Sequence, residues 1–144
     1  MFLMDRIVGA FSYIKNDSNV LMIKRKDNPY SSYWSIPGGT VRYGESLSEA
    51  AVREVREETN LETEIIQLIG HVNFTADHDP SQLFRAYVFK SRYLSGNLRI
   101  GTEVEEAKWV EEKDIQQLRI ALPILRFYEK MVSTTERPIE VNVI

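Results

Sequence analysis

The chain has 144 residues, enough for one domain with a single hydrophobic core and too few for two ordinary domains. It is 43% hydrophobic and 27% charged, as in a typical globular protein, and its net charge of -3 argues against a domain that binds long nucleic acids. The lack of cysteine excludes disulfides, thiolate nucleophiles and zinc–sulfur sites. The sequence has neither a signal-peptide pattern nor a long apolar run, so we expect a cytoplasmic protein without a membrane span.

The first half of the chain predicts paired strands followed by a helix. Apolar runs bounded by turn residues predict three strands, at 7–14, 20–23 and 33–36. The helix is expected over 46–59, where Ser46 and Glu49 have the spacing of a capping box. Asn60 follows it, and asparagine tolerates the left-handed conformation that commonly ends helices.

Strands also dominate the second half of the chain. They are expected at 64–69, 72–75, 83–90 and 107–110. A short helix at 114–118 and a longer one at 124–132 follow, which makes the chain an α/β domain over residues 1–132. We expect residues 133–144 to form a loosely held C-terminal tail, although the alternation at 139–144 also allows an added strand.

The central helix carries an unusual set of charges. Three carboxylates share an arc of about 100° beside its apolar face: Glu54, Glu57 and Glu58. Like charges three or four residues apart destabilise a helix by roughly 0.2–0.5 kcal/mol each, and the helix dipole disfavours them in the second half of a helix. A divalent cation reverses these terms, and hard oxygen ligands suit Mg²⁺ or Mn²⁺. The alternative is a solvated acidic face partnered by Arg53 and Arg56.

The spacing of polar residues around this helix matches a known signature. Gly39, Glu45 and the run Arg53-Glu54-Val55-Arg56-Glu57-Glu58-Thr59-Asn60-Leu61 lie at fixed intervals. This box, from Gly39 to Leu61, resembles the signature of the MutT-like Nudix hydrolase family, with Asn60 in place of its last glycine. The resemblance extends in outline over residues 5–132. It implies an α/β/α sandwich with a mixed sheet, in which residues 39–61 form the motif loop and helix.

The resemblance also implies an activity. It indicates a pyrophosphohydrolase that uses Mg²⁺, or alternatively Mn²⁺, to cleave a nucleoside diphosphate linked to another moiety. Such substrates include nucleoside triphosphates, nucleotide sugars and ADP-ribose. The metal ligands carried over by position are Glu54, Glu57, Glu58 and the backbone carbonyl of Gly39.

The remaining catalytic roles are assigned by the same comparison of positions. Arg53 is expected to pair with Glu45 and hold the loop against the helix. The general base comes either from the helix, where Glu57 is the candidate, or from the later acidic loop, where we prefer Glu103. The alternative for Glu103 is a solvated acidic loop.

The substrate is expected to be a small nucleotide bound by a monomer or a homodimer. Arg25 is our candidate for a phosphate contact, with a solvated strand end as the alternative. Trp34 and Tyr43 are candidates for stacking on the base, although core packing is the stronger explanation for Trp34. Further aromatic candidates, for most of which core packing is the competing explanation, are Tyr30, Tyr33, Phe74 and Phe84.

Two other functions remain open from the sequence. One is a catalytically silent nucleotide-sensing Nudix domain, which the retention of all three motif glutamates argues against. The other is an RNA 5′-end pyrophosphohydrolase, which the low content of basic residues disfavours because a grip on the phosphate backbone comes from Lys and Arg.

Overall fold

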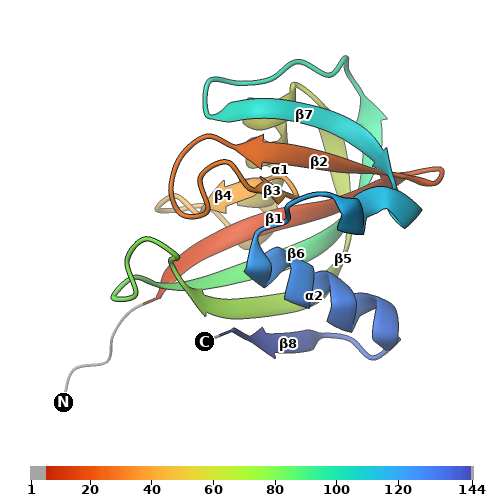
Figure 1. The fold of residues 1–144 in the computed structure, drawn as a ribbon. Helices are drawn as coiled ribbons and strands as arrows, with labels where there is room; N and C mark the ends of the chain where they lie inside the picture. The colour runs from red at the N-terminus through yellow and green to blue at the C-terminus, as the bar shows by residue number, and fades with distance from the viewer. Residues whose placement is uncertain (1–5, 144) are drawn as a thin grey trace.

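A mixed sheet with helices packed on it makes up the computed structural model, which describes residues 6–143 (Figure 1). The strands are β1 (Ile7–Asn16), β2 (Asn19–Arg25), β3 (Trp34–Ser35), β4 (Gly38–Thr40), β5 (Glu62–Thr75), β6 (Leu83–Ser95), β7 (Val104–Glu111) and β8 (Ile139–Asn142). The helices are α1 (Leu47–Thr59), α2 (Leu122–Ser133) and the short 3-10 helix η1 (Glu112–Gln117). The expectations for residues 1–5 and for Ile144 lie outside the described residues.

The order of the strands is β3-β2-β1-β6-β5-β8, with β4 pairing to β1 and β7 to β2. Strand β1 runs parallel to β6, and β5 runs parallel to β8, whereas the other pairs are antiparallel. The β1–β2 hairpin pairs only near its turn, at Lys15–Val20 and Asn16–Asn19. Nearer the start of β1, residues Gly9–Phe11 pair with the short strand β4, and Gly38–Thr40 of β4 lie next to α1.

The two α-helices cover opposite faces of the sheet. Successive residues of a strand point to opposite faces, and β1 shows both. Ala10 and Ile14 pack in the clusters beneath α1, whereas Phe11 and Tyr13 pack against the cluster that includes α2. In Figure 1, α2 lies in front of the sheet and α1 behind it. The expected α/β/α sandwich is therefore confirmed.

The ends of α1 are set by local chemistry, as the sequence predicts. The Ser46 hydroxyl accepts from the Glu49 amide at 3.1 Å, and the Glu49 carboxylate accepts from the Ser46 amide at 3.1 Å. At the other end, Asn60 is left-handed with φ 65°, and its amide donates to the Arg56 carbonyl at 2.9 Å. The box residue that departs from the family pattern therefore adopts the conformation that its glycine would supply.

One long strand replaces two of the expected short ones. Strand β5 continues through both 64–69 and 72–75, and its pairing with β6 shifts register between Ile65 and Gln67 and again between Leu68 and Gly70. These irregularities break the alternation of apolar residues, which is why the pattern alone suggested two strands.

The C-terminal segment belongs to the sheet. Residues Ile139–Asn142 form β8, which pairs in parallel with Gly70–Asn73 of β5. A side chain at Gly70 would collide with the backbone of Ile139, so the glycine allows the two strands to approach. Of the two expectations for this segment, the added strand is thus found over Ile139–Asn142.

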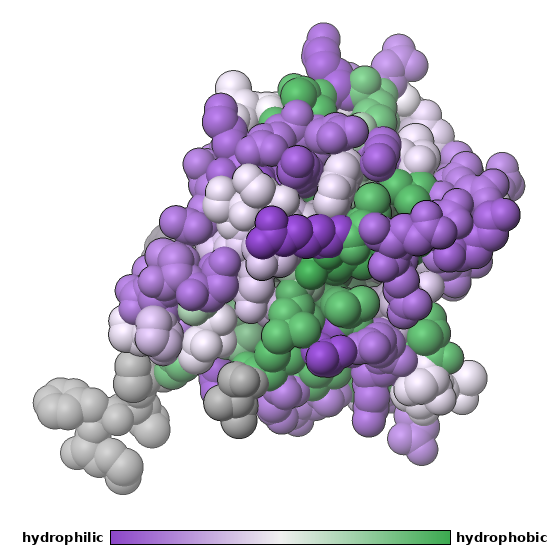
Figure 2. Space-filling model, viewed as in Figure 1, coloured by the Kyte–Doolittle hydropathy of each residue, from purple (hydrophilic) through white to green (hydrophobic). Residues whose placement is uncertain are grey.

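Helix α2 packs its buried side chains against the sheet and leaves some apolar surface open. Its buried residues are Pro123, Ile124, Phe127 and Met131. Leu122 and Val132 are 38% and 57% exposed, and Figure 2 shows apolar side chains gathered over this helix within a mostly hydrophilic face. Within residues 6–143, no helix combines the length and apolar character needed to cross a membrane.

Candidate functional site

The glutamates of α1 differ in burial because of their place around the helix. Val55 is fully buried against the sheet, and its neighbours on that side, Glu54 and Glu58, are only 7% and 5% exposed. Glu57 lies farther round, with 42% of its side chain exposed. The structure thus contains the arc expected from helical spacing, with two carboxylates beside the core and the third at the surface.

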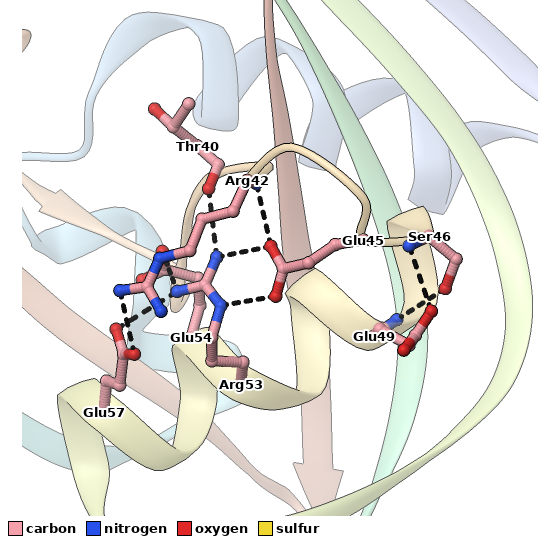
Figure 3. Close-up of polar contacts among 8 residues, drawn as sticks. All are labelled: Thr40, Arg42, Glu45, Ser46, Glu49, Arg53, Glu54 and Glu57. Carbon is pink, nitrogen blue, oxygen red and sulfur yellow. Dashed lines mark hydrogen bonds and ion pairs between the residues drawn. The ribbon is translucent and has the colours of Figure 1, made fainter.

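Arg53 joins the motif loop to these carboxylates (Figure 3). Its Nε and Nη2 atoms donate to the two carboxylate oxygens of Glu45 at 2.6 and 2.9 Å, which is the expected pair. Its Nη1 atom donates to Glu54 at 2.9 Å and to Glu57 at 3.1 Å. The Nη2 atom also donates to the carbonyl of Thr40 at 3.1 Å. One guanidinium therefore fixes the loop and two glutamates relative to one another.

A second arginine contacts the outermost glutamate. Arg42 Nη2 lies 3.1 Å from Glu57 Oε1, in an exposed ion pair (Figure 3). The Arg42 amide donates to Glu45 Oε1 at 2.8 Å. Since exposed ion pairs contribute little stability, the Arg42–Glu57 contact can open at small cost.

The charges of the two buried carboxylates are only partly compensated by neighbouring groups. Burial raises the pKa of Glu54, and burial together with the neighbouring Glu54 raises the pKa of Glu58 well above its usual value. Glu58 has one compensating hydrogen bond, from the Gly38 amide at 2.8 Å. In contrast, hydrogen bonds from Arg53 lower the pKa of Glu45 to about 2. Arg53 thus balances part of the charge of Glu54, whereas no cationic side chain within residues 6–143 forms an ion pair with Glu58.

These carboxylates border a polar cavity of about 340 Å³. Its wall includes Glu54, Glu57, Glu58, Glu103, Arg25 and Arg42. Gly39 also lines it, and a Cβ atom there would lie 2.6 Å from the carboxyl carbon of Glu54. The glycine thus lets the backbone approach the glutamate at the wall of this cavity.

The donor set of this cavity fits Mg²⁺ or Mn²⁺. Both ions prefer oxygen ligands, and the wall supplies carboxylates, two of which have raised pKa values because burial leaves their charge only partly compensated. In the part of the chain that the structure describes, no three His, Asp or Glu side chains converge closely enough to hold an ion as they lie. Glu57 is paired instead with Arg42 and Arg53, so ion binding requires its side chain to turn.

A divalent cation is expected to raise the thermal midpoint of unfolding, and by more at pH 8 than at pH 5. Because the pKa values of Glu54 and Glu58 are raised, protons compete with the ion as the pH falls. A ligand at about a hundredfold excess over its Kd stabilises by about 2.7 kcal/mol. Calorimetry with MgCl₂, MnCl₂ or EDTA at both pH values measures the effect, with KCl of equal ionic strength as the control. Equal shifts at the two pH values would contradict the assignment.

A second cavity, of about 320 Å³, adjoins the polar one and shares Arg25, Asn28, Gly39 and Thr40 with it. Its aromatic lining consists of Phe11, Tyr30, Phe74 and Phe84. Phe74 and Phe84 stack with their ring centroids 5.1 Å apart, and Tyr30 approaches Phe74 edge-on at 6.3 Å. An apolar, aromatic cavity beside a polar one suits a ligand with a planar ring at one end and charged groups at the other.

The residues expected to contact substrate are distributed unevenly around these cavities. Arg25 lines both cavities. Glu103 lines the polar one, whereas Glu105 and Glu106 do not. Trp34 is only 7% exposed and belongs to the core, and Tyr43 is fully exposed and lines neither cavity. The structure therefore places both expected stacking residues away from the cavities, because one packs inward from β3 and the other projects from the tip of the motif loop.

Several lining residues escaped the sequence analysis. Asn28 and Thr40 border both cavities, and Gln82 and Pro123 border the aromatic one. Asn28 and Gln82 lie in loops, Pro123 lies at a helix start, and Thr40 ends the three-residue strand β4, so no periodic pattern indicates which way their side chains point. Only their closeness to turn residues was visible in the sequence.

The chain resembles known proteins over most of its length. The model of a family described as NUDIX domain matches residues 5–131. An ADP-ribose pyrophosphatase of Methanocaldococcus jannaschii is 36% identical over 111 residues, which cover 77% of this chain and 65% of that protein. A Bacillus subtilis protein named "Putative 8-oxo-dGTP diphosphatase" is 38% identical over 103 residues, which cover 71% of this chain and 64% of that protein. The chain thus spans a little under two thirds of each relative.

The crystal structure of a MutT protein from Methanosarcina mazei Go1 superimposes with a TM-score of 0.79 at 26% identity, covering 91% of this chain and 97% of that one.

Proposed function

Because the chain belongs to the Nudix hydrolase family, we propose that it hydrolyses a phosphoanhydride bond in a small nucleotide with the help of Mg²⁺ or Mn²⁺. The observation that carries the proposal is one polar cavity that collects Glu54, Glu57, Glu58 and Glu103 and opens beside an aromatic cavity. A nucleotide needs both environments, one for its phosphates and one for its base.

The chain's own groups divide the work in this proposal. Glu54, Glu57 and Glu58, with the Gly39 carbonyl, hold the metal, which when bound neutralises the phosphates and activates water for attack. Glu103 lines the same cavity and accepts the proton from the attacking water at its carboxylate. If Glu57 is the general base instead, Glu103 only contributes negative charge that helps to balance the metal ion.

Two arginines assist in different ways. Arg25 lies where the two cavities meet, so its guanidinium binds the phosphates of a nucleotide that spans both. Arg53 does not reach toward the aromatic cavity and instead keeps Glu54 and Glu57 oriented by its hydrogen bonds. The catalytic set is therefore Glu57, Glu103 and the metal ligands, with Arg53 as a positioning residue.

The substrate class follows from the shared chemistry of the relatives. ADP-ribose and 8-oxo-dGTP, which appear in the names of two relatives, both contain a nucleoside diphosphate linked to a further group. The aromatic cavity, at about 320 Å³, is near the lower end of the range for small-molecule sites, so it accommodates one base with its sugar. We therefore favour substrates with a single base.

A substrate panel tests the proposal. Purified protein is incubated with ADP-ribose, nucleotide sugars, dinucleotides, and normal and oxidised nucleoside triphosphates, each with Mg²⁺, Mn²⁺ or EDTA. We expect hydrolysis of at least one single-base substrate with metal and none with EDTA. Tight nucleotide binding without any turnover would instead support a sensing domain. Turnover of triphosphorylated RNA with a steep salt dependence would support the RNA 5′-end alternative.

A further inference from the structure

Two loops that are far apart in the sequence are tied together over the aromatic cavity. Residues 26–33 follow β2, and residues 76–82 connect β5 to β6. The amide of Tyr30, in the first loop, donates a hydrogen bond of 2.8 Å to Oδ1 of Asp77 in the second. Tyr30 lines the aromatic cavity, and so do His78 and Gln82 from the second loop. The bond therefore joins the two segments that form one side of the cavity.

The backbone of Tyr30 adopts a conformation that needs such support. Its φ of 58° lies in the left-handed region, which is unfavourable for a residue with a large side chain. A conformation of this kind persists where the surroundings fix it, and it is common at ligand sites. Here the Asp77 carboxylate holds the Tyr30 amide, while the Tyr30 carbonyl accepts from the Tyr33 amide at 3.1 Å.

The ring of Tyr30 is fixed between two other aromatic rings. It meets Tyr33 edge-on at 5.5 Å between centroids and Phe74 at 6.3 Å. Tyr33 is itself covered by Arg119, whose guanidinium carbon lies 4.0 Å from its ring centre. With its backbone held by Asp77 and its ring held by neighbours, Tyr30 presents a preformed aromatic surface to the cavity.

The same loop is connected to the polar cavity at its other side. Arg25 Nε donates to the Pro29 carbonyl at 2.7 Å, next to Tyr30, and Arg25 lines both cavities. A nucleotide that places its phosphates near Arg25 therefore has its base beside the loop that carries Tyr30. The loop is held at two points, by Arg25 from the phosphate side and by Asp77 from the far side.

We propose that Asp77 is a positioning residue that sets affinity for the base of the substrate by holding Tyr30 against the aromatic cavity. The inference rests on the proposed function, because it assumes that the base occupies this cavity. It assigns Asp77 no part in metal binding or in proton transfer, since it lines neither cavity. Loss of the carboxylate acceptor therefore weakens contacts to the base and leaves those to the phosphates unchanged.

The test compares ligands with and without a base. Calorimetric titration of the full chain with AMP, GMP, CMP and UMP, and with ribose 5-phosphate, is carried out without divalent metal. Asp77→Ala is expected to weaken binding of the preferred mononucleotide by about tenfold, the effect of one hydrogen bond to a charged group. Binding of ribose 5-phosphate is expected to stay the same. Asp77→Asn keeps an oxygen acceptor at this position and is expected to restore most of the affinity.

A double-mutant cycle shows whether Asp77 acts through Tyr30. Tyr30→Ala is expected to weaken mononucleotide binding as well, and adding Asp77→Ala to it should cause little further loss. Glu64→Ala, which removes an exposed carboxylate from the distant end of β5, is the control and should bind like the parent. Circular dichroism of each variant checks that it is folded.

The outcomes separate the inference from the proposed function. Where a substrate is turned over, Asp77→Ala should raise KM and leave kcat unchanged. A protein that hydrolyses nothing but binds a mononucleotide in an Asp77-dependent way would refute the proposed function and uphold the inference. Equal affinities for Asp77→Ala and parent, a matching loss for ribose 5-phosphate, or no mononucleotide binding by the parent would each overturn the inference.

Discussion

Replacing Glu57 by glutamine is expected to abolish metal-dependent hydrolysis and to leave the fold intact. Glu57 lies on the wall of the polar cavity, and its amide replacement can neither balance a divalent charge nor accept a proton from water. Groups that supply such chemistry contribute about 10²–10⁴-fold in rate. The side chain is 42% exposed, and within residues 6–143 its ion pairs are with Arg42 and Arg53, so its replacement should change stability little. Measurements of kcat/KM and of the thermal midpoint on the same preparation test both statements.

A matched variant controls for the loss of charge. Glu62 also pairs with an arginine, Arg56, close to the end of α1, but it does not line the cavity. Glu62→Gln should therefore keep full activity. Full activity in Glu57→Gln would contradict its role in the site.

The identity of the general base can be resolved with the same design. Glu103→Gln should lower kcat with little change in metal affinity if Glu103 accepts the proton, because Glu54 and Glu58 remain to hold the ion. Glu106→Gln, three residues along and outside the cavity, is its control. Unchanged kcat in Glu103→Gln would assign the role to the α1 glutamates.

Replacing Arg53 by alanine is expected to destabilise the protein by about 3 kcal/mol, because it leaves Glu54 buried without its partner. The change also removes the bonds that join Glu45 and the Thr40 carbonyl to α1. Arg53→Lys should lose most of the same energy, since an ammonium group cannot bridge these acceptors as a planar guanidinium does. Urea unfolding measures the difference.

The helix contains its own control for this prediction. Arg56 lies one turn beyond Arg53 but pairs with Glu62 in solvent, so Arg56→Ala should change the free energy of unfolding only slightly. An Arg53→Ala protein as stable as Arg56→Ala would show that the buried network does not stabilise the fold.

The pH dependence of the Arg53→Ala effect follows from Glu45. Hydrogen bonds from Arg53 lower the pKa of Glu45 in the folded protein to about 2, against an ordinary value of 4.5. A lowered folded-state pKa contributes stability above pH 4.5 that is lost as the pH falls toward 2. The difference in stability between parent and Arg53→Ala should therefore shrink across this window. A stability difference between parent and Arg53→Ala that stays constant with pH would show that the Arg53–Glu45 hydrogen bonds do not contribute to it.

The sequence determined those features of the molecule that depend on near neighbours along the chain. The capping box of α1 and the left-handed Asn60 are each set within a few residues, so residue types at fixed offsets predict them. The same holds for the arc of glutamates, because helical geometry places residues three and four apart on one side. The box from Gly39 to Leu61 therefore sufficed to locate the motif helix and its carboxylates and to indicate the family.

The tertiary structure decided which other residues reach that helix. Glu103 lies on the cavity wall and Glu106 does not, although both belong to one acidic segment. Trp34 is buried in the core, whereas Tyr30 lines the aromatic cavity, although both are aromatic residues of neighbouring segments. Such differences depend on contacts between loops distant in sequence, such as the bond from Tyr30 to Asp77, and no local period encodes them. For β8, the alternation at 139–144 left a strand and a loose tail open, and the pairing with β5 that Gly70 permits decided for the strand.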